Sequence, residues 1–223
     1  MLKLHGFNAS NYVNMVLFSL LEKGVDFEFV THYPTQEPDF LAINPIGKVP
    51  VLETEHGFLC ETQVILEYID QVAGGPALFP SEPFARAQVK QLMHMIELYL
   101  ELPARRCYGE AFFGGKVSDD TKAEVREALL KGVRALAGKT SFAPYLFGDD
   151  LTAADAMLLY SADLAGTVAA TLFDLDLLAE APGAAGLIER LNQRDSAKQV
   201  ARDREASMEK FLKYARGGKQ VPS

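Results

Sequence analysis

The first third of the chain alternates between segments with the spacing of strands and of helices. The run 2–7 predicts a short buried strand, and apolar residues recur at helical spacing over 11–23. Gly24 stands where such a helix would end. The segment 26–30 alternates polar and apolar residues, which is typical of a half-buried strand. Together they predict a β-α-β unit with parallel strands and a right-handed crossover.

The following stretch has a different order of patterns. Residues 38–43 fit a single helical turn, and 49–53 and 58–60 predict two short strands that form a hairpin around 55–57. Residues 62–72 have the apolar spacing of an amphipathic helix. We expect one side of that helix to carry Val64, Ile65, Tyr68, Ile69 and Val72. The order of elements is therefore β-α-β followed by β-β-α.

Glycine and proline mark a boundary after this region. Residues 74–76 are Gly-Gly-Pro and residues 81–83 are Ser-Glu-Pro, which indicates a linker. Beyond it the strand pattern stops, and helical patterns occupy 84–113, 118–137, 152–170, 184–194 and 196–215. We expect an α/β domain over 1–75, a linker over 76–83 and an all-helical domain over 84–223.

Two local signals refine the helical half. Pro103 predicts a bend in the helix expected over 84–113, because proline cannot donate a backbone hydrogen bond. Thr152 and Asp155 stand three residues apart and predict a capping box at the start of a helix.

Composition and charge exclude several classes of function. Of the 223 residues, 48% are hydrophobic, as in a globular protein, and the formal net charge is -8 with no basic cluster. Nucleic acid is therefore not an expected partner, because duplex binding needs a concentrated positive surface. No uninterrupted apolar stretch approaches a membrane span, and the N-terminus enters a strand without a leader. We expect a cytoplasmic protein that binds no membrane.

Cysteine usage agrees with a reducing compartment. Cys60 and Cys107 are the two cysteines, far apart in the sequence, and no C-x-x-C pair suggests a metal or redox motif. The chain has no glycine-rich phosphate loop and no clustered histidine or cysteine ligands. We therefore expect no metal and no nucleotide.

Two segments give the chain a specific resemblance. Residues 44–52, Asn-Pro-Ile-Gly-Lys-Val-Pro-Val-Leu, resemble the N-P-x-G-x-V-P segment of the cytosolic glutathione transferases. Residues 60–65, Cys-Glu-Thr-Gln-Val-Ile, resemble the x-E-S-x-A-I segment of the same family. The cap at Thr152 and Asp155 and the order of elements also match, so the resemblance covers essentially the whole chain. It is most similar to serine-type, phi-like and theta-like bacterial members.

This resemblance implies a fold and an activity. The fold is α/β plus all-α: a thioredoxin-like domain that binds glutathione, followed by a helical domain that contributes the electrophile site. The activity is transfer of alkyl or aryl groups to glutathione, a detoxification reaction that needs the glutathione thiolate. Relatives are homodimers, in which the N-terminal domain of one subunit packs on the helical domain of the other.

The resemblance places the catalytic serine of such members at Ser10. This residue precedes the predicted helix 11–23, where the helix dipole favours an anion. The alternative is that Ser10 only caps the helix, as serine often does. Asn8, Asn11 and Tyr12 are close enough in sequence to share or replace the role.

The family's glutathione-binding positions correspond to residues in the two motifs. Val49 and Pro50 would hold a cis bond that exposes the Val49 backbone to the cysteinyl part of glutathione. Glu61 would pair with the γ-glutamyl ammonium and Thr62 with the adjacent carboxylate, although a threonine cap beside a solvated glutamate is the alternative. Lys48 would reach the glycine carboxylate, a position for which phi-like members use a His-Lys pair that is absent here. Only His32 and Gln36 stand near that position in this chain.

The electrophile would be a small hydrophobic molecule. The candidates for its pocket are Phe7, Asn8, Tyr12, Arg106, Tyr108 and Phe112. Aromatic residues on a helix more often belong to the core, and Arg105 and Arg106 could instead pair with Glu101 and Glu110. Two other functions stay open: a non-catalytic adaptor for protein partners, and another glutathione-dependent reaction such as that of a peroxidase, dehalogenase or isomerase.

Overall fold

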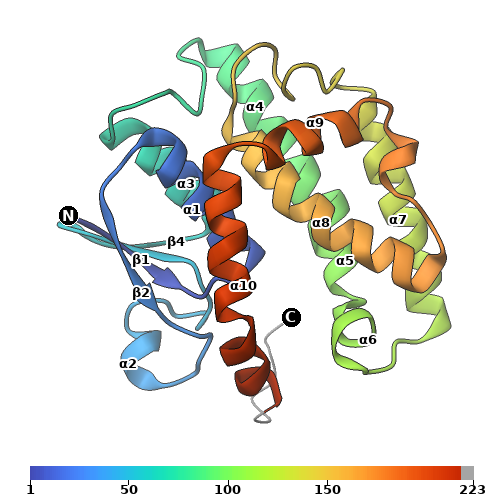
Figure 1. Cartoon of the computed structure of the whole chain (residues 1–223), viewed down its shortest axis with the longest axis horizontal. Coiled ribbons are helices and arrows are strands. Elements are labelled where there is room, and N and C mark those ends of the chain that lie inside the picture. Colours follow the sequence, from blue (N-terminus) through green and yellow to red (C-terminus); the bar gives the residue numbers. More distant parts are fainter. Residues whose placement is uncertain (217–223) are drawn as a thin grey trace. The chain divides into compact units, whose positions relative to one another are not determined.

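The computed structural model describes residues 1–216 of the chain. They form two compact units, coloured along the chain in Figure 1. The first unit contains residues 1–78 together with the segment that begins at Arg194, and the second contains residues 79–193. The C-terminal helix therefore belongs to the same unit as the N-terminal sheet.

The first unit is built on a sheet of four strands in the order β2-β1-β3-β4. The strands are β1 (Leu2–Gly6), β2 (Phe27–Thr31), β3 (Val51–Thr54) and β4 (Gly57–Cys60). β1 pairs with β2 in parallel, whereas the β1–β3 and β3–β4 pairs are antiparallel. The predicted β-α-β and β-β-α order of a thioredoxin-like domain is confirmed.

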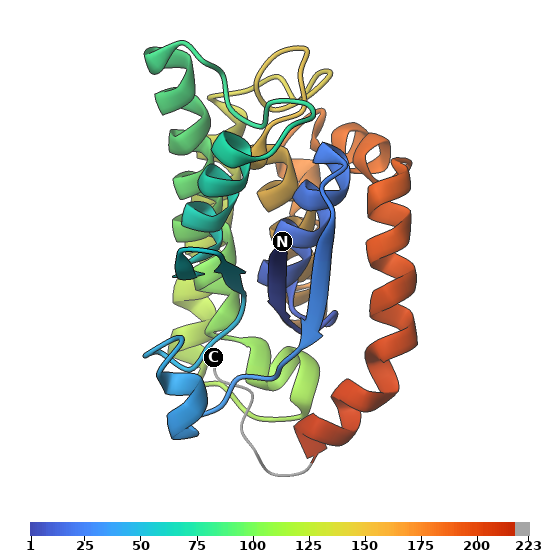
Figure 2. The same cartoon turned by 90° about the vertical axis from the view of Figure 1, so that its left-hand side faces the viewer.

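Four helices complete this unit. They are α1 (Asn11–Lys23), α2 (Pro38–Leu41), α3 (Thr62–Val72) and α10 (Asp195–Arg216). The predicted end of α1 is confirmed, because Gly24 adopts φ 62° and its N–H bonds the last carbonyls of the helix. Helix α1 packs against α3 and α10, and α10 runs alongside α1 in Figures 1 and 2. On α3, Ile65 and Ile69 are buried as predicted, but Val64 and Val72 are 49% and 55% exposed.

A buried ion pair ties the far ends of α1 and α3 together. Lys23 Nζ lies 3.2 Å from Asp70 Oδ1, and their side chains are only 1% and 7% exposed. The ammonium also donates to the carbonyl of Pro76 at 2.9 Å, and the N–H of Leu78 donates to Asp70 at 2.7 Å. The pair therefore fixes where the chain leaves α3.

A second ion pair anchors the beginning of α10. Arg194 donates two hydrogen bonds to the carboxylate of Glu22, at 2.7 and 2.6 Å, and the hydroxyl of Ser196 donates to the same group. Burial opposes ionisation, but these hydrogen bonds outweigh it and hold the pKa of Glu22 below its ordinary value. The anchor is thus charged at neutral pH, and its contribution to stability is lost only as pH falls through that lowered pKa. This helix was expected in the helical domain over 84–223, whereas its contacts group it with the sheet.

The second unit is helical. Its elements are α4 (Pro83–Ile96), the π-helix η1 (Glu97–Glu101), α5 (Leu102–Arg105), α6 (Tyr108–Phe113), α7 (Asp119–Ala137), α8 (Ala153–Phe173), the 3-10 helix η2 (Leu178–Glu180) and α9 (Ala184–Asn192). α8 is central and packs against α4, η1, α5, α6, α7 and α9. Among the helices described, α8 alone is long and apolar enough to cross a membrane. However, 56% of its most apolar 18-residue stretch is buried inside the protein, as expected of a core helix.

The predicted capping box at the start of α8 is confirmed. The carboxylate of Asp155 accepts hydrogen bonds from the N–H and the hydroxyl of Thr152, at 2.8 and 2.9 Å. Its other oxygen accepts the N–H of Leu146 at 2.8 Å, so the cap also fixes the preceding loop. Because Asp155 is fully buried, losing these bonds would leave a charge in the core.

The helix predicted over 84–113, with a bend at Pro103, is interrupted by η1 just before Pro103 and again between α5 and α6. Pro103 has no N–H to donate to the carbonyl of Tyr99, and the helix widens there into η1. The Tyr99 carbonyl faces Gly132 of α7, where a Cβ atom would come within 2.4 Å of the oxygen. The helix ends at Arg105, and α6 begins only at Tyr108.

The ion pair at the ends of α1 and α3 gives a stability prediction. Lys23→Met leaves Asp70 buried without its cation, so the free energy of unfolding is expected to fall by about 3 kcal/mol. Urea unfolding followed by circular dichroism measures the change. Adding Asp70→Asn should recover part of the loss, and Lys131→Met, on the exposed side of α7, should change stability by less than about 0.5 kcal/mol. A Lys23→Met protein as stable as the Lys131→Met control would contradict this role.

Candidate functional site

The predicted binding residues come together at one end of the sheet. His5 pairs with Val51, and Val51 pairs with Cys60, so three neighbouring strands are aligned in one row there. Neighbouring strands lie about 4.8 Å apart. The chain segments beyond this row contain Ser10 after β1, Val49 and Pro50 before β3, and Glu61 and Thr62 after β4.

Ser10 is the N-cap of α1, with extended backbone angles. Its Oγ accepts the N–H of Val13 at 3.4 Å, which is longer than a good hydrogen bond. Within residues 1–216 this is the one hydrogen bond that the hydroxyl makes, so its proton is not committed to a protein acceptor. The capping role is therefore present, and it leaves the hydroxyl able to donate to an anion at the helix N-terminus.

The loop that carries Ser10 is braced by residues that the sequence analysis missed. Asn14 is fully buried on α1, and its Nδ2 donates to the carbonyl of Asn8 at 3.0 Å. The N–H of Ser10 donates to the carbonyl of Phe7 at 3.0 Å. A buried asparagine among apolar helix positions is the sequence signal that would have pointed to this support.

The turn before β3 holds Val49 and Pro50 in place. The predicted cis conformation of the Val49–Pro50 bond is confirmed. Asn44 is 4% exposed, accepts the N–H of Ile46 at 3.1 Å and donates to the carbonyl of Lys48 at 2.7 Å. The side chain of Lys48 is exposed. Asn44, the first residue of the N-P-I-G motif, therefore has a structural role: its side chain holds the turn together.

Glycine is required inside that turn. Gly47 has φ 71°, and a Cβ atom there would lie 2.3 Å from the carbonyl oxygen of Thr35. The N–H of Thr35 donates to the carbonyl of Gly47 at 3.0 Å. The turn is consequently packed directly on the segment that follows β2.

Glu61 and Thr62 stand at the start of α3. Glu61 has φ 69°, which is uncommon for a residue with a side chain and costs about 1 kcal/mol or more. It is exposed and forms no side-chain cap, whereas Thr62 is 6% exposed. An exposed carboxylate held in a strained conformation beside a helix N-terminus is suited to binding a ligand with both a cation and an anion.

The two residues near the expected glycine end are engaged in packing. The ring of His32 lies 4.5 Å from that of Phe40 and 5.8 Å from that of His5. Burial and the nearby His5 hold the pKa of His32 below its ordinary value. Gln36 Nε2 donates to the carbonyl of Ile46 at 3.3 Å. Gln36 therefore supports the turn around Gly47, whereas His32 packs against Phe40 and His5.

The expected electrophile residues fall in both units. In the first unit, Phe7 is 7% exposed, and its ring contacts those of Tyr33 and Phe211 at centroid distances of 5.1 and 5.5 Å. Asn8 and Tyr12 are half-buried. Phe7 is thus mainly a packing residue of this unit.

In the second unit, Tyr108 and Phe112 lie in edge-to-face contact at 5.2 Å. The hydroxyl of Tyr108 donates to the buried carboxylate of Glu101 at 3.3 Å, and the guanidinium of Arg105 lies 5.1 Å from the centre of the Tyr108 ring. Arg105 also pairs with Glu101 at 2.7 Å, as the sequence analysis considered. Tyr108 is therefore held by neighbours of its own unit.

Arg106 is engaged at the surface. It pairs with Glu124 at 2.6 Å, and both side chains are about half exposed or more, at 49% and 64%. The alternative partner considered from the sequence was Glu110, four residues away. The actual partner is on α7 and was not predictable from local spacing.

Of the two cysteines, Cys107 is buried and Cys60 is half-buried. Burial raises the pKa values of Cys60 and Cys107, so both are poor nucleophiles at neutral pH. Within the described part of the chain, no group of three or more histidine, cysteine or acidic side chains is arranged to hold a metal ion.

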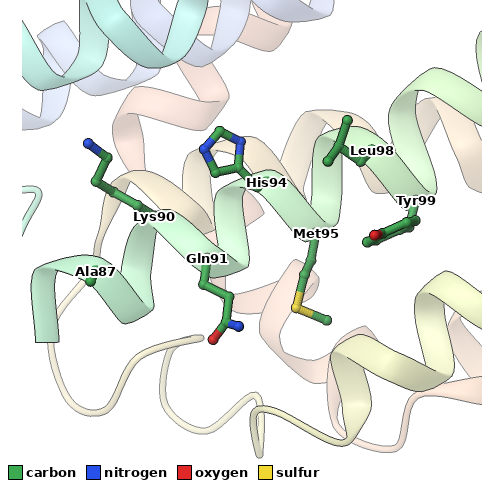
Figure 3. Close-up of a pocket in the computed structure, with 7 residues that line it drawn as sticks. All are labelled: Ala87, Lys90, Gln91, His94, Met95, Leu98 and Tyr99. Carbon is green, nitrogen blue, oxygen red and sulfur yellow. The ribbon is translucent and has the colours of Figure 1, made fainter. Parts of the chain in front are cut away.

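A groove of about 520 Å³ lies on one side of α4 and η1. Figure 3 shows its lining side chains along successive turns of the helix. They are Ala87, Lys90, Gln91, His94, Met95, Leu98 and Tyr99. None of the predicted site residues lines this groove, so it is a separate feature of the second unit.

Comparison with known proteins identifies the family. The family model described as glutathione S-transferase, N-terminal domain, matches residues 4–77. A glutathione S-transferase of Pseudomonas putida is 50% identical over 220 residues, which cover 99% of this chain and 100% of the relative.

Solved structures agree. Glutathione transferase F7 from Populus trichocarpa is 27% identical with a TM-score of 0.75, covering 92% of this chain and 99% of that one. Glutathione transferase F2 from the same species has a TM-score of 0.78 at 23% identity, covering 92% and 100%, and shows the fold. Because the Pseudomonas relative matches over its full length and the predicted motifs lie at one end of the sheet, the chain belongs to the glutathione S-transferase family.

Proposed function

We propose that this protein is a glutathione transferase that stabilises the glutathione thiolate for attack on small hydrophobic electrophiles. The observation that carries the proposal is the Ser10 hydroxyl at the N-terminus of α1, whose single hydrogen bond in the described chain is a long one. The cis bond before Pro50 and the strained Glu61 extend from the same end of the sheet. The full-length similarity to a glutathione S-transferase supports the same activity.

The chemistry follows from the pKa of the thiol. A hydrogen bond from Ser10 to the charged sulfur is worth about 1.5–3 kcal/mol, and the dipole of α1 adds about 0.3–1 kcal/mol. At 1.36 kcal/mol per unit, the thiol pKa falls by about one to three units, and its proton leaves to solvent. The sulfur lone pair then forms the bond to the electrophilic carbon, and a leaving group, where present, departs with its electrons.

The rest of glutathione matches the remaining groups at this end of the sheet. The Val49 backbone pairs with the cysteinyl backbone, and Glu61 binds the γ-glutamyl ammonium. Thr62, at the N-terminus of α3, binds the adjacent carboxylate. Lys48, whose side chain is exposed, attracts the glycine carboxylate in this proposal. No metal takes part.

The electrophile pocket is proposed to include Phe7, Asn8, Tyr12, Arg106, Tyr108 and Phe112. Residues 1–75 form the glutathione-binding domain, and the helical region after the linker supplies the second part of the pocket. A peroxidase, dehalogenase or isomerase would use the same thiolate and differ in this pocket. An adaptor for protein partners is the less favoured function, because the complete glutathione motif, including the strained Glu61, has no use in it.

We also propose that the protein is a cytoplasmic homodimer with a role in detoxification. Support for the dimer comes from apolar side chains that their own unit leaves exposed. Val64 and Val72 on α3 are 49% and 55% exposed, and Leu98 and Tyr99 beside the groove are 49% and 51% exposed. A contact between α3 of one copy and the α4–η1 face of another would cover both sets.

Ser10→Ala tests the catalytic proposal. We expect the variant to bind S-methylglutathione like the wild type, because that ligand has no ionisable thiol. The pKa of bound glutathione should rise by at least about one unit, and kcat/KM for a model electrophile should fall by about tenfold to a hundredfold. The ultraviolet absorbance of the bound thiolate against pH measures the pKa. If Ser10→Ala depresses the thiol pKa as the wild type does, Asn8, Asn11 or Tyr12 carries the role. If the wild type does not bind glutathione at all, the proposed transferase activity is wrong.

Glu61 allows strain and binding to be separated. Glu61→Gly and Glu61→Ala both lose the carboxylate, so both should bind S-methylglutathione about tenfold or more weakly. Only glycine relieves the positive φ, so the glycine variant should be more stable to urea than the alanine variant by about 1 kcal/mol. Unchanged affinity in both would exclude Glu61 as a ligand, and equal stability would show that the backbone is not strained.

Leu98→Glu tests the dimer. A charge placed among the exposed apolar residues of η1 should prevent a second copy from packing there. Sedimentation velocity should then show a species near the 24.5 kDa of one chain in place of the dimer expected for the wild type. Leu212→Glu, at a position on α10 that is 39% exposed, is the control and should remain dimeric. A monomeric wild type, or a dimer that survives Leu98→Glu, would contradict the proposed interface.

A further inference from the structure

Helix α10 contacts the loop that carries Ser10. The ring of Phe211 stacks on the ring of Phe7, with centroids 5.5 Å apart and an interplanar angle of 17°. The carbonyl of Phe7 accepts the N–H of Ser10, so the position of Phe7 bears directly on that of Ser10. One residue further, Asn8 Nδ2 donates to the carbonyl of Asp203 at 3.4 Å. Two side chains of this loop are therefore engaged by α10.

The same helix contacts the segment that follows β2. The ring of Tyr214 stacks on that of Tyr33 at 4.3 Å and 17°, and its hydroxyl donates to the carbonyl of Pro34 at 2.8 Å. Burial raises the pKa of Tyr214, so the hydroxyl keeps the proton that it donates. Since Tyr33 also lies 5.1 Å from Phe7, four aromatic rings form a continuous row.

This second contact leads to the other side of the proposed glutathione site. The N–H of Thr35 donates to the carbonyl of Gly47, and Gln36 donates to the carbonyl of Ile46. Gly47 directly precedes Lys48 and Val49. The row of rings thus connects α10 both to the loop of Ser10 and to the turn that presents Val49.

We propose that α10 is a brace for the glutathione site, with Phe211 and Tyr214 as positioning residues that act through the Ser10 loop and through the turn around Gly47. The proposal rests on the proposed function. Helix α10 is suited to this task because the Glu22–Arg194 pair fixes its first turn on α1, the helix that Ser10 caps. A reacting group displaced by about 1 Å can lose a hundredfold in rate, so a loop held only by its own backbone would be a poor support for Ser10.

The two positioning residues should have different effects. Phe211 stacks on Phe7 in the loop that carries Ser10, so its loss should reduce thiolate stabilisation more than binding. Tyr214 contacts the segment packed on Gly47, so its loss should reduce binding more than thiolate stabilisation. A helix that merely adds stability would affect neither of these quantities separately.

The experiment compares Phe211→Ala and Tyr214→Phe with Leu212→Ala in the full-length protein. Leu212 lies on the same turn of α10 and is 39% exposed, so its alanine variant controls for the change in helix composition. Each protein is titrated with S-methylglutathione for affinity and with glutathione for the pKa of the bound thiol. Thermal unfolding of each variant records any general loss of stability.

For Phe211→Ala we expect the pKa of bound glutathione to rise by about one unit, so the thiolate fraction at a pH below that pKa falls about tenfold. Its affinity for S-methylglutathione should stay within about threefold of wild type. For Tyr214→Phe we expect about fivefold weaker binding of S-methylglutathione, the factor for one net hydrogen bond, and an unchanged thiol pKa. Should Phe211→Ala fail to fold, Phe211→Leu keeps the apolar volume without the flat ring and is expected to shift the thiol pKa in the same direction.

The brace is overturned if the Phe211 variants match Leu212→Ala in thiol pKa and Tyr214→Phe matches it in affinity, even where thermal stability falls. This result differs from a failure of the proposed function. In that case the wild type would not depress the thiol pKa, or Ser10→Ala would depress it equally, whatever the α10 variants do.

Discussion

The buried pair of Lys23 and Asp70 is the constraint on which the first unit depends. It joins α1 and α3 near their C-terminal ends, while Ser10 and Thr62 stand at their N-terminal ends. Because helices are stiff, fixing one pair of ends also fixes the other, over the roughly 16–20 Å that such helices span. The cost of burying two charges is therefore offset by a geometry that places two helix N-termini at the same end of the sheet.

Much of this unit follows from short-range patterns in the sequence. Alternation and helical spacing predicted its strands and helices, and the Asn44 to Leu52 motif predicted the cis bond. Patterns of this kind identify an element but not its partner. The spacing over 196–215 gives the helix α10, yet its place in the first unit depends on Glu22, more than 170 positions away. For the same reason the apolar spacing of α3 could not show that Val64 stays exposed.

The candidate site divides in a similar way. The two motifs pointed to Val49 and Glu61, the family resemblance pointed to Ser10, and the strand register brings their segments together. The supporting groups differ in kind: the role of Phe211 depends on contact with Phe7, far away in the sequence, whereas Asn14 bonds the nearby Asn8 and its buried position among apolar residues was a usable signal. Phe7 was expected in the electrophile pocket, but a stacked contact with Phe211 and a tilted contact with Tyr33 make it a packing residue as well. The close approach of Gly132 to the Tyr99 carbonyl of η1 is likewise a contact that no local pattern records.

The surroundings of Cys60 have a consequence for redox chemistry. This half-buried thiol directly precedes Glu61, and its Sγ lies 3.7 Å from the carbonyl oxygen of Ile43. Burial and the adjacent carboxylate raise its pKa, so at neutral pH almost none of it is the thiolate that disulfide exchange needs. The Cys60 thiol next to the proposed glutathione site is therefore a poor participant in thiol–disulfide exchange. It should resist the formation of a mixed disulfide even when the cellular pool becomes oxidised.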